Sequence, residues 1–219
     1  MVIAIDGYSS SGKSTLAKDL AKALGFIYVD TGAMYRAITY YFIKDALNFE
    51  DNHILGEHLP KIELTFRNEG GDNKIFLNGE DVSVIIRTLE VSSKVSEVAA
   101  LPAVRKKLVA IQQSMASENL VMDGRDIGTV VFPAAEVKFF VNADVNERSK
   151  RRHMELTKKG DKVSLDEILS NLMHRDLIDT TRTTSPLKKA EDAIAIDTTH
   201  LSREDQLEFA LDVVKNKLA

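Results

Sequence analysis

The sequence contains no cysteine among its 219 residues. This absence excludes disulfide bonds, thiolate zinc sites and a cysteine nucleophile, and it fits a reducing compartment. The chain also lacks an apolar run near the ~20 residues that a membrane-spanning helix needs. Its first residues, MVIAID, reach an acidic side chain too soon for a signal peptide. We therefore expect a cytoplasmic protein with no membrane partner.

A positive net charge is lacking as well. Lys and Arg number 29 against 33 Asp and Glu, which gives a formal net charge of −4. Nucleic-acid-binding domains usually carry a basic field, so we expect no nucleic-acid partner. The 44% of hydrophobic and 28% of charged residues are an ordinary globular balance. The length suits one domain with an insert, which we expect to span residues 1–219.

Five short apolar runs predict buried strands, at residues 2–6, 26–30, 120–123, 137–141 and 193–197. Near-continuous apolar runs suit the strands of a parallel sheet that is covered on both faces. Between them lie helical patterns, at residues 14–24, 33–47, 102–115, from 164 onward and at 202–218. Ser164 and Glu167 form a capping box at the start of the fourth helix. Strands that alternate with helices predict an α/β fold with crossover connections.

One stretch departs from this alternation. Residues 62–66 and 74–77 have strand-like composition and flank the sequence Gly-Gly-Asp-Asn, and Asn78-Gly79 follows. This pattern predicts a small antiparallel hairpin inserted between the second and third strands of the core.

The most specific motif is G-x-x-x-x-G-K-[ST], the pattern of a phosphate-binding loop, or P-loop. It follows a predicted strand and opens a predicted helix, which is the context that the motif requires. Its glycines let backbone N–H groups point at phosphate oxygens, and the helix adds its positive N-terminal end. Lys13 would neutralise the β and γ phosphates, and Ser14 would bind Mg²⁺. The predicted ATP-binding residues are Gly7, Tyr8, Ser9, Ser10, Ser11, Gly12, Lys13, Ser14 and Thr15.

Arginines gather around the same predicted edge of the sheet. By their spacing or position, three sets stand out: Arg148, Arg151 and Arg152; Arg175, Asp179 and Arg182; Arg36 and Arg125. A single arginine is usually a solvated surface charge. These lie near the C-terminal ends of strands that share an edge with the P-loop, where phosphoryl transfer needs cations around two phosphates that repel each other.

Asp123 ends a predicted strand. A carboxylate at that place commonly orders the water of Mg²⁺ in P-loop enzymes. An aspartate at the end of a strand can equally cap the turn that follows. Both interpretations of Asp123 stay open at this point.

Five segments together resemble the bacterial cytidylate kinases, a family of nucleoside monophosphate kinases: GYSSSGKST from residue 7, VDTGAMYR from 29, IRTLEVSSKVSEVAALPAVR from 86, MDGRDIGTVVFP from 122 and HRDLIDTTR from 174. The resemblance implies a P-loop kinase core with a five-stranded parallel sheet, a monophosphate-binding region at residues 31–105 that holds the hairpin, and a short helical lid at residues 147–163. It also implies an enzyme that transfers the γ-phosphoryl group of ATP to CMP or dCMP with Mg²⁺. We expect a monomer.

The resemblance assigns roles residue by residue. The acceptor phosphate would contact Thr31, Arg36, Arg125 and Arg182; cytosine would contact Ser96, Arg105 and Asp126; the sugar would contact Arg175 and Asp179. Catalysis would involve Lys13, Arg148, Arg152 and Arg182. The chemistry agrees, because an aspartate can accept a hydrogen bond from the N4 amino group of cytosine.

Two other functions remain possible on the residues alone. One is a kinase for a different small acceptor, which would keep the P-loop but would not need Ser96, Arg105 and Asp126 together. The other is a regulatory ATPase with no small-molecule acceptor.

Overall fold

The computed structural model describes residues 1–69, 72–116, 119–158 and 160–218. The chain forms two compact units. Unit 1 consists of Met1–Tyr28 and Ala116–Ala219, and unit 2 consists of Val29–Met115. The phosphate-binding loop lies in unit 1 and the inserted hairpin in unit 2.

A five-stranded sheet has the order β2-β6-β1-β7-β8. Its strands are β1 (Val2–Gly7), β2 (Ile27–Asp30), β6 (Leu120–Gly124), β7 (Val137–Asn142) and β8 (Ile194–Asp197). β1 pairs in parallel with both β6 and β7, and β7 pairs in parallel with β8. The five predicted strands and their parallel pairing are therefore confirmed.

The prediction that every strand is buried on both faces holds only at the centre of this sheet. β1 and β6 are buried along their whole length. β2 and β8 carry exposed residues, Ile27 among them. These two are the edge strands of the sheet, and an edge strand is covered less completely than a central one.

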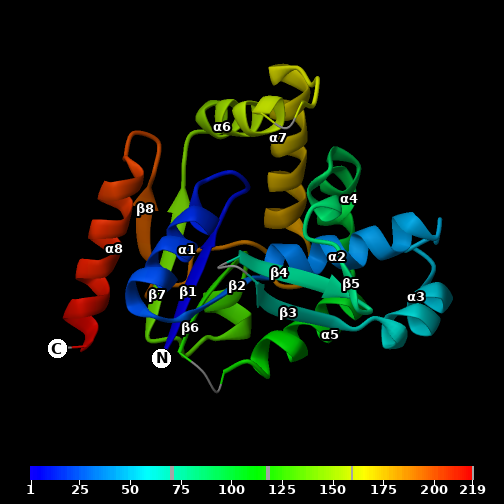
Figure 1. Ribbon diagram of the computed structural model, residues 1–219, viewed down its shortest axis with the longest axis horizontal. Coiled ribbons are helices and arrows are strands. Elements are labelled where there is room, and N and C mark those ends of the chain that lie inside the picture. The colour runs from blue at the N-terminus through cyan, green and yellow to red at the C-terminus, as the bar shows by residue number, and fades with distance from the viewer. Residues whose placement is uncertain (70–71, 117–118, 159, 219) are drawn as a thin grey trace. The chain divides into compact units, whose positions relative to one another are not determined.

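The helices of unit 1 are α1 (Lys13–Leu24), α6 (Val145–Lys158), α7 (Leu165–Thr181) and α8 (Arg203–Leu218), with one π-helical turn, η3 (Ile127–Val131). α1 and α8 lie side by side against the sheet (Figure 1) and share its hydrophobic core. Leu20 of α1 and Val214 of α8 are fully buried there. This packing holds the helix that opens at the P-loop firmly on the sheet.

α6 and α7 pack against each other through a small core of their own, formed by Leu156, Ile168 and Leu172 (Figure 1). The predicted capping box of α7 is present. Glu167 N donates to Ser164 Oγ over 3.2 Å, and Ser164 N donates to Glu167 Oε2 over 2.9 Å. The cap sets where α7 begins.

The helices of unit 2 are α2 (Thr31–Lys44), α3 (Asn52–His58), α4 (Leu89–Ala100) and α5 (Pro102–Gln113), with the 3₁₀ turns η1 (Leu59–Lys61) and η2 (Ile85–Arg87). Their apolar faces form one core, in which Ile38, Val98 and Leu108 are fully buried. The carboxylate of Asp30 caps α2 by accepting from Ala33 N over 2.8 Å.

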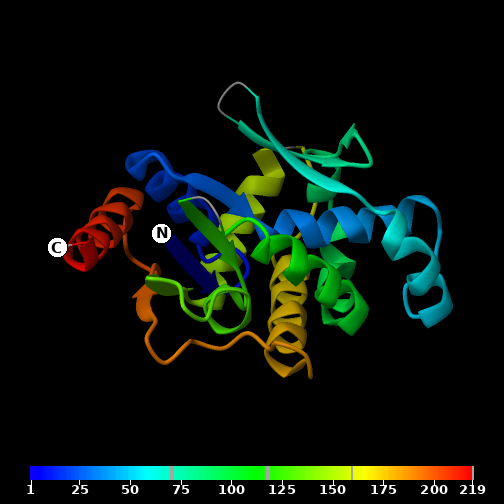
Figure 2. The ribbon, with the colours of Figure 1, turned by 90° about the horizontal axis from the view of Figure 1, so that it is seen from below.

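The inserted sheet of unit 2 has the order β3-β4-β5, with β3 (Leu64–Glu69), β4 (Asp72–Leu77) and β5 (Glu80–Asp81). The predicted hairpin is β3 and β4, which pair antiparallel and form the long cyan ribbon of Figure 2. The Gly-Gly pair of its predicted turn, residues 70–71, lies outside the described residues. The short strand β5 was not predicted. It follows a turn in which Asn78 and Gly79 both have positive φ, 48° and 84°, as a two-residue hairpin turn requires.

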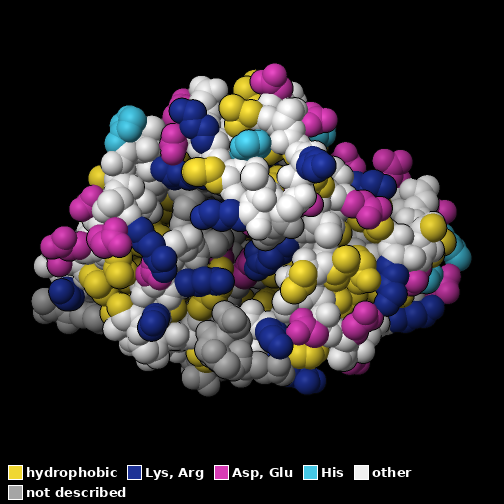
Figure 3. Space-filling model, turned by 45° about the horizontal axis from the view of Figure 1, so that its top comes forward, with side chains coloured by type: hydrophobic (Ala, Val, Ile, Leu, Met, Phe, Trp, Pro, Cys, Tyr) yellow, Lys and Arg dark blue, Asp and Glu magenta, His cyan; other side chains and the backbone are white. Residues whose placement is uncertain are grey.

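Charged side chains of both signs are interspersed on the face drawn in Figure 3. This mixture fits the small net charge of −4. Among the described residues, no helix has the length and apolar character needed to cross a membrane.

Candidate active site

The backbone of the P-loop depends on glycine at two places. Gly7, at the end of β1, has φ 153°, and a Cβ there would collide with the carbonyl oxygen of Val141 in β7. Gly12, directly before α1, has φ 90°, a conformation that L side chains rarely adopt. The loop therefore joins a buried strand to a helix N-terminus, the arrangement that the motif predicts.

Lys13 is buried, with 7% of its surface exposed. Its ammonium group donates to the carbonyl oxygen of Tyr8 over 3.1 Å, so the side chain turns back over the loop. Ser11 is fully buried, and its Oγ has no hydrogen-bond partner within the part of the chain that the structure describes. Buried hydroxyls usually have a partner. The loop thus offers a cation and a hydroxyl group in a protected place.

Ser14 and Asp123 meet at the start of α1. Ser14 Oγ donates to Asp123 Oδ2 over 2.7 Å, and Tyr28 Oη donates to Asp123 Oδ1 over 2.8 Å. Asp123 is buried, with 2% exposed. A hydroxyl beside a carboxylate fits Mg²⁺, which prefers oxygen ligands and commonly binds one or two carboxylates together with substrate phosphates.

A group of buried charges joins β6 to the end of α7. Arg125 Nε donates to Asp179 Oδ2 over 2.8 Å, and Arg125 Nη2 donates to Ser9 Oγ in the P-loop over 2.7 Å. Arg182 lies 3.9 Å from both Asp126 Oδ1 and Asp179 Oδ1. The fold therefore brings together residues predicted to bind the acceptor phosphate, the base and the sugar.

Asp179 is charged in this environment for a clear reason. Burial alone would raise the pKa of its carboxyl, but the guanidinium groups of Arg125, Arg175 and Arg182 hold that pKa below its ordinary value. A charged Asp179 in turn fixes the orientation of Arg125, because its oxygen accepts from Arg125 Nε.

Asp6 is a buried carboxylate that the sequence did not single out. Its two oxygens accept from the backbone N–H groups of Ile127 and Gly128, each over 2.8 Å. Burial raises the pKa of Asp6 to about 7, although these two hydrogen bonds oppose the rise. Asp6 thereby attaches the C-terminal end of β1 to the segment that directly follows Asp126.

The three arginines of α6 have separate partners in the structure. Arg148 Nη1 pairs with Asp176 Oδ2 at 2.8 Å, and its guanidinium carbon lies 5.1 Å from the centre of the Tyr8 ring. Arg152 pairs with Glu155 at 2.9 Å. The predicted roles of Arg148 and Arg152 in phosphate binding stay predictions.

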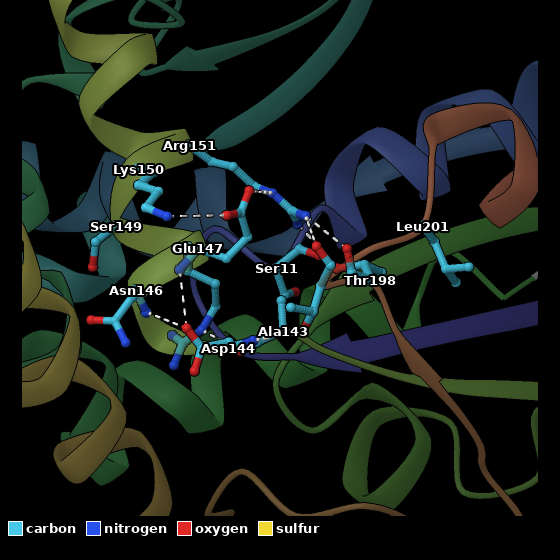
Figure 4. Close-up of polar contacts among 12 residues, drawn as sticks. Ser11, Ala143, Asp144, Asn146, Glu147, Ser149, Lys150, Arg151, Thr198 and Leu201 are labelled. Carbon is cyan, nitrogen blue, oxygen red and sulfur yellow. Dashed lines mark hydrogen bonds and ion pairs between the residues drawn. The ribbon is translucent and has the colours of Figure 1, made fainter.

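Arg151 belongs to the same set in the sequence but was given no role, and its side chain is directed to Thr198, the residue after β8 (Figure 4). Its Nη1 donates to Thr198 Oγ1 over 3.1 Å and its Nη2 donates to Thr198 O over 2.7 Å. Thr198 Oγ1 donates to the carbonyl oxygen of Ser11 over 2.7 Å. No motif marks Thr198, so pattern reasoning alone missed this contact.

Unit 2 has its own cluster of charges at the start of α2. Asp30 Oδ2 lies 3.0 Å from Nη2 of both Arg36 and Arg87. Burial opposes ionisation of Asp30, but Arg36 and Arg87 lower its pKa to about 2. Thr31, which follows Asp30, is buried. Arg87 was not predicted, because nothing in its local sequence distinguishes it from a surface arginine.

The remaining predicted base contacts are on α4 and α5. Ser96 and Arg105 are both buried, with 2% exposed. Arg105 Nη1 donates to Ala99 O over 3.2 Å, and its guanidinium carbon lies 5.4 Å from the centre of the Tyr35 ring. A guanidinium group buried among helices is unusual and suits a binding residue more than a solvated surface charge.

Comparison with known proteins agrees with this chemistry. The chain matches the family model described as cytidylate kinase over residues 3–216. It is 51% identical to a curated cytidylate kinase of Flavobacterium psychrophilum over 222 residues, which cover 99% of this chain and 98% of that protein. It is 49% identical to the cytidylate kinase of Carboxydothermus hydrogenoformans, with 99% of this chain and 98% of that protein covered.

Solved structures with low sequence identity share the fold. An uncharacterized protein from Eubacterium ventriosum has a TM-score of 0.52 at 12% identity and is covered over 98% of both chains. A gluconokinase from Sinorhizobium meliloti has a TM-score of 0.50 at 14% identity, over 98% of this chain and 91% of that one. At such low sequence identity, these two similarities support the fold alone. The match over nearly the whole sequence and the identity to curated relatives establish that this chain belongs to the cytidylate kinase family.

Proposed function

We propose that this protein transfers the γ-phosphoryl group of ATP to CMP or dCMP, giving ADP and CDP or dCDP. The observation that carries the proposal is a complete P-loop, in which Ser14 Oγ donates a hydrogen bond to Asp123. This loop belongs to a chain that is 51% identical to a cytidylate kinase over 99% of its length. The P-loop accounts for a nucleoside triphosphate donor. The relatives account for the choice of acceptor.

The donor triphosphate binds residues 7–15 in this proposal. Lys13 balances the charge that grows on the β and γ oxygens as the phosphoryl group leaves. The buried Ser11 hydroxyl, which lacks a partner among the described residues, would donate to a phosphate oxygen. Ser14 and Asp123 would hold Mg²⁺, directly or through its water, and this ion would neutralise phosphate charge.

The acceptor nucleotide has three parts, and in this proposal each part has its own contact residues. Its phosphate contacts Thr31, Arg36, Arg125 and Arg182, its base contacts Ser96, Arg105 and Asp126, and its sugar contacts Arg175 and Asp179. The hydrogen bond from Arg125 to Asp179 supports this part, because a guanidinium held in place by a buried carboxylate loses little freedom when it binds a phosphate. The acceptor phosphate is already an anion at neutral pH, so catalysis needs alignment and charge neutralisation more than a strong base.

A lid at residues 147–163 would close over ATP and exclude water, which would otherwise hydrolyse it. In this proposal Arg148 and Arg152 leave their carboxylate partners, Asp176 and Glu155, and approach the phosphates. Lys159 of the predicted lid lies outside the described residues. A monomeric state and a cytoplasmic location also stay predictions.

A coupled assay of ADP release over a panel of nucleoside monophosphates tests the proposal. We expect rapid turnover with CMP and dCMP, and slower turnover with UMP and AMP. A preference for AMP, UMP or a sugar acid would identify a kinase with another acceptor. Slow hydrolysis of ATP that ignores every acceptor would identify a regulatory ATPase.

A further inference from the structure

The hydroxyl group of Thr198 joins α6 to the P-loop. Thr198 directly follows β8 and is fully buried. Arg151 donates to its Oγ1 over 3.1 Å, and the same Oγ1 lies 2.7 Å from the carbonyl oxygen of Ser11. Figure 4 shows the side chain of Arg151 directed from α6 to Thr198, next to Ser11. Residues that are distant in the sequence thus form one hydrogen-bond chain, Arg151–Thr198–Ser11.

The direction of these hydrogen bonds follows from the chemistry of the groups. A guanidinium group can only donate, so the threonine oxygen accepts from Arg151. The single hydroxyl hydrogen of Thr198 must then go to an acceptor. Ser11 O at 2.7 Å is closer than Asn142 O at 3.2 Å. A charged donor on Thr198 strengthens the bond that Thr198 makes to the loop.

The same network covers the second glycine of the motif. A Cβ added to Gly12 would lie 3.9 Å from Arg151 Nη1, 3.9 Å from Thr198 Oγ1 and 3.5 Å from Gln206 Oε1. The arginine, the threonine and α8 therefore surround the part of the loop where the backbone has its left-handed conformation. The Ser11 carbonyl accepts from Thr198, which lies outside the motif.

We propose that Arg151 and Thr198 are positioning residues for the donor nucleotide. Their hydrogen-bond chain holds the Ser11–Gly12 part of the P-loop in the shape that accepts the phosphates of a nucleoside triphosphate. A loop that is held in its binding conformation before the ligand arrives pays less conformational entropy on binding. The phosphoryl transfer that this nucleotide would serve rests on the proposed function. The effect of the two residues on the affinity for the donor nucleotide can be measured without that reaction.

The test is the affinity of a non-hydrolysable ATP analogue, measured by isothermal titration calorimetry without acceptor. Thr198→Val keeps the shape of the side chain and removes the hydroxyl, Thr198→Ser keeps the hydroxyl, and Arg151→Gln removes the charged donor. Lys150→Gln is the matched control, because Lys150 is the neighbour of Arg151 on α6. Both side chains pair with Glu147, Lys150 Nζ at 4.0 Å and Arg151 Nε at 3.4 Å, but Lys150 does not point to Thr198 (Figure 4).

We expect Thr198→Val and Arg151→Gln to weaken binding of the analogue about tenfold, since each leaves a buried polar group without its usual partner. Thr198→Ser and Lys150→Gln should stay within about twofold of the wild type. In steady-state assays, the KM for ATP should rise in the first two variants while the KM for CMP at saturating ATP is unchanged.

Several results would overturn the proposal. Wild-type affinity in both Thr198→Val and Arg151→Gln would remove the role of the hydrogen-bond chain. Equal loss in Thr198→Ser and Thr198→Val, or equal rises in the KM for CMP and for ATP, would point to general support of the fold. If thermal unfolding shows that Thr198→Val is unfolded, Arg151→Gln decides, because its side chain is partly exposed. A wild type that does not phosphorylate CMP would contradict the proposed function and leave the titration valid.

Discussion

Ser14 and Asp123 are 109 positions apart in the sequence, and the structure joins them by a hydrogen bond of 2.7 Å from Ser14 Oγ to Asp123 Oδ2. The P-loop motif predicts that Ser14 binds Mg²⁺. The place of Asp123 at a strand end made it a candidate for the same ion or, equally, for a cap of the turn that follows. Their contact puts the hydroxyl and the carboxylate at one site. The second oxygen of Asp123 accepts from Tyr28, which also fits a structural role.

Replacing Asp123 separates these two interpretations. We expect Asp123→Asn to raise the Mg²⁺ concentration needed for half-maximal rate about ten- to hundredfold, as substitutions around metal sites do. Tyr28→Phe, which removes a hydrogen bond from the same carboxylate, should change the Mg²⁺ titration by less than about fivefold. If Asp123→Asn leaves the Mg²⁺ titration unchanged and lowers the melting temperature, Asp123 has the structural role of capping the turn after its strand.

Lys13→Ala should lower kcat about 10²- to 10³-fold, because the ammonium group matters most when charge develops on the leaving γ-phosphoryl group. Lys22→Ala is the control, since Lys22 is an exposed lysine on the same helix. Circular dichroism should show both variants folded. Turnover near the wild-type value in folded Lys13→Ala would exclude the P-loop lysine from the mechanism.

Asp126→Asn tests discrimination between bases. Cytosine presents an N4 donor where uracil presents an O4 acceptor, so a carboxylate favours CMP and opposes UMP. An amide of the same size can turn its NH₂ toward O4. We expect the difference in kcat/KM between CMP and UMP to narrow by about 1–3 kcal/mol, mainly through poorer use of CMP. The same ratio in both proteins would mean that Asp126 does not read the base.

Asp6 predicts a pH dependence of stability. Burial raises its pKa from 3.8 to about 7, so between these values the folded chain binds a proton that the unfolded chain releases. The contribution of Asp6 to the free energy of unfolding is therefore greatest below pH 4 and declines by up to about 4 kcal/mol as the pH rises to 7. Asp6→Asn cannot titrate and should lack this decline.

The measurement is urea unfolding of the wild type and Asp6→Asn from pH 4 to 8. The charged neighbours of Asp6, which include Asp126 and Arg125, are the same in both proteins. We expect the stability of the wild type relative to Asp6→Asn to fall with rising pH. A constant difference over this range would show that Asp6 keeps an ordinary pKa.

Much of the fold could be predicted because its signals are local. The apolar runs of the five strands, the capping box at Ser164 and the glycines of the P-loop each act within a few residues. The short strand β5 was missed, because two exposed residues, Glu80 and Asp81, carry no apolar pattern and pair only when β4 is already in place. Local patterns predict elements well and short edge strands poorly.

The sequence by itself determined the P-loop, the alternation of strands and helices, and the family, because each is encoded in contiguous residues. The tertiary structure alone decided which charged side chains meet partners that are distant in the sequence. Arg125 lies 54 positions from Asp179 and Arg151 lies 47 from Thr198, and only the packing of β6, β8, α6 and α7 brings them into contact. A long side chain binds whichever buried oxygen the fold places within its reach, and that distance is set by packing and not by spacing along the chain.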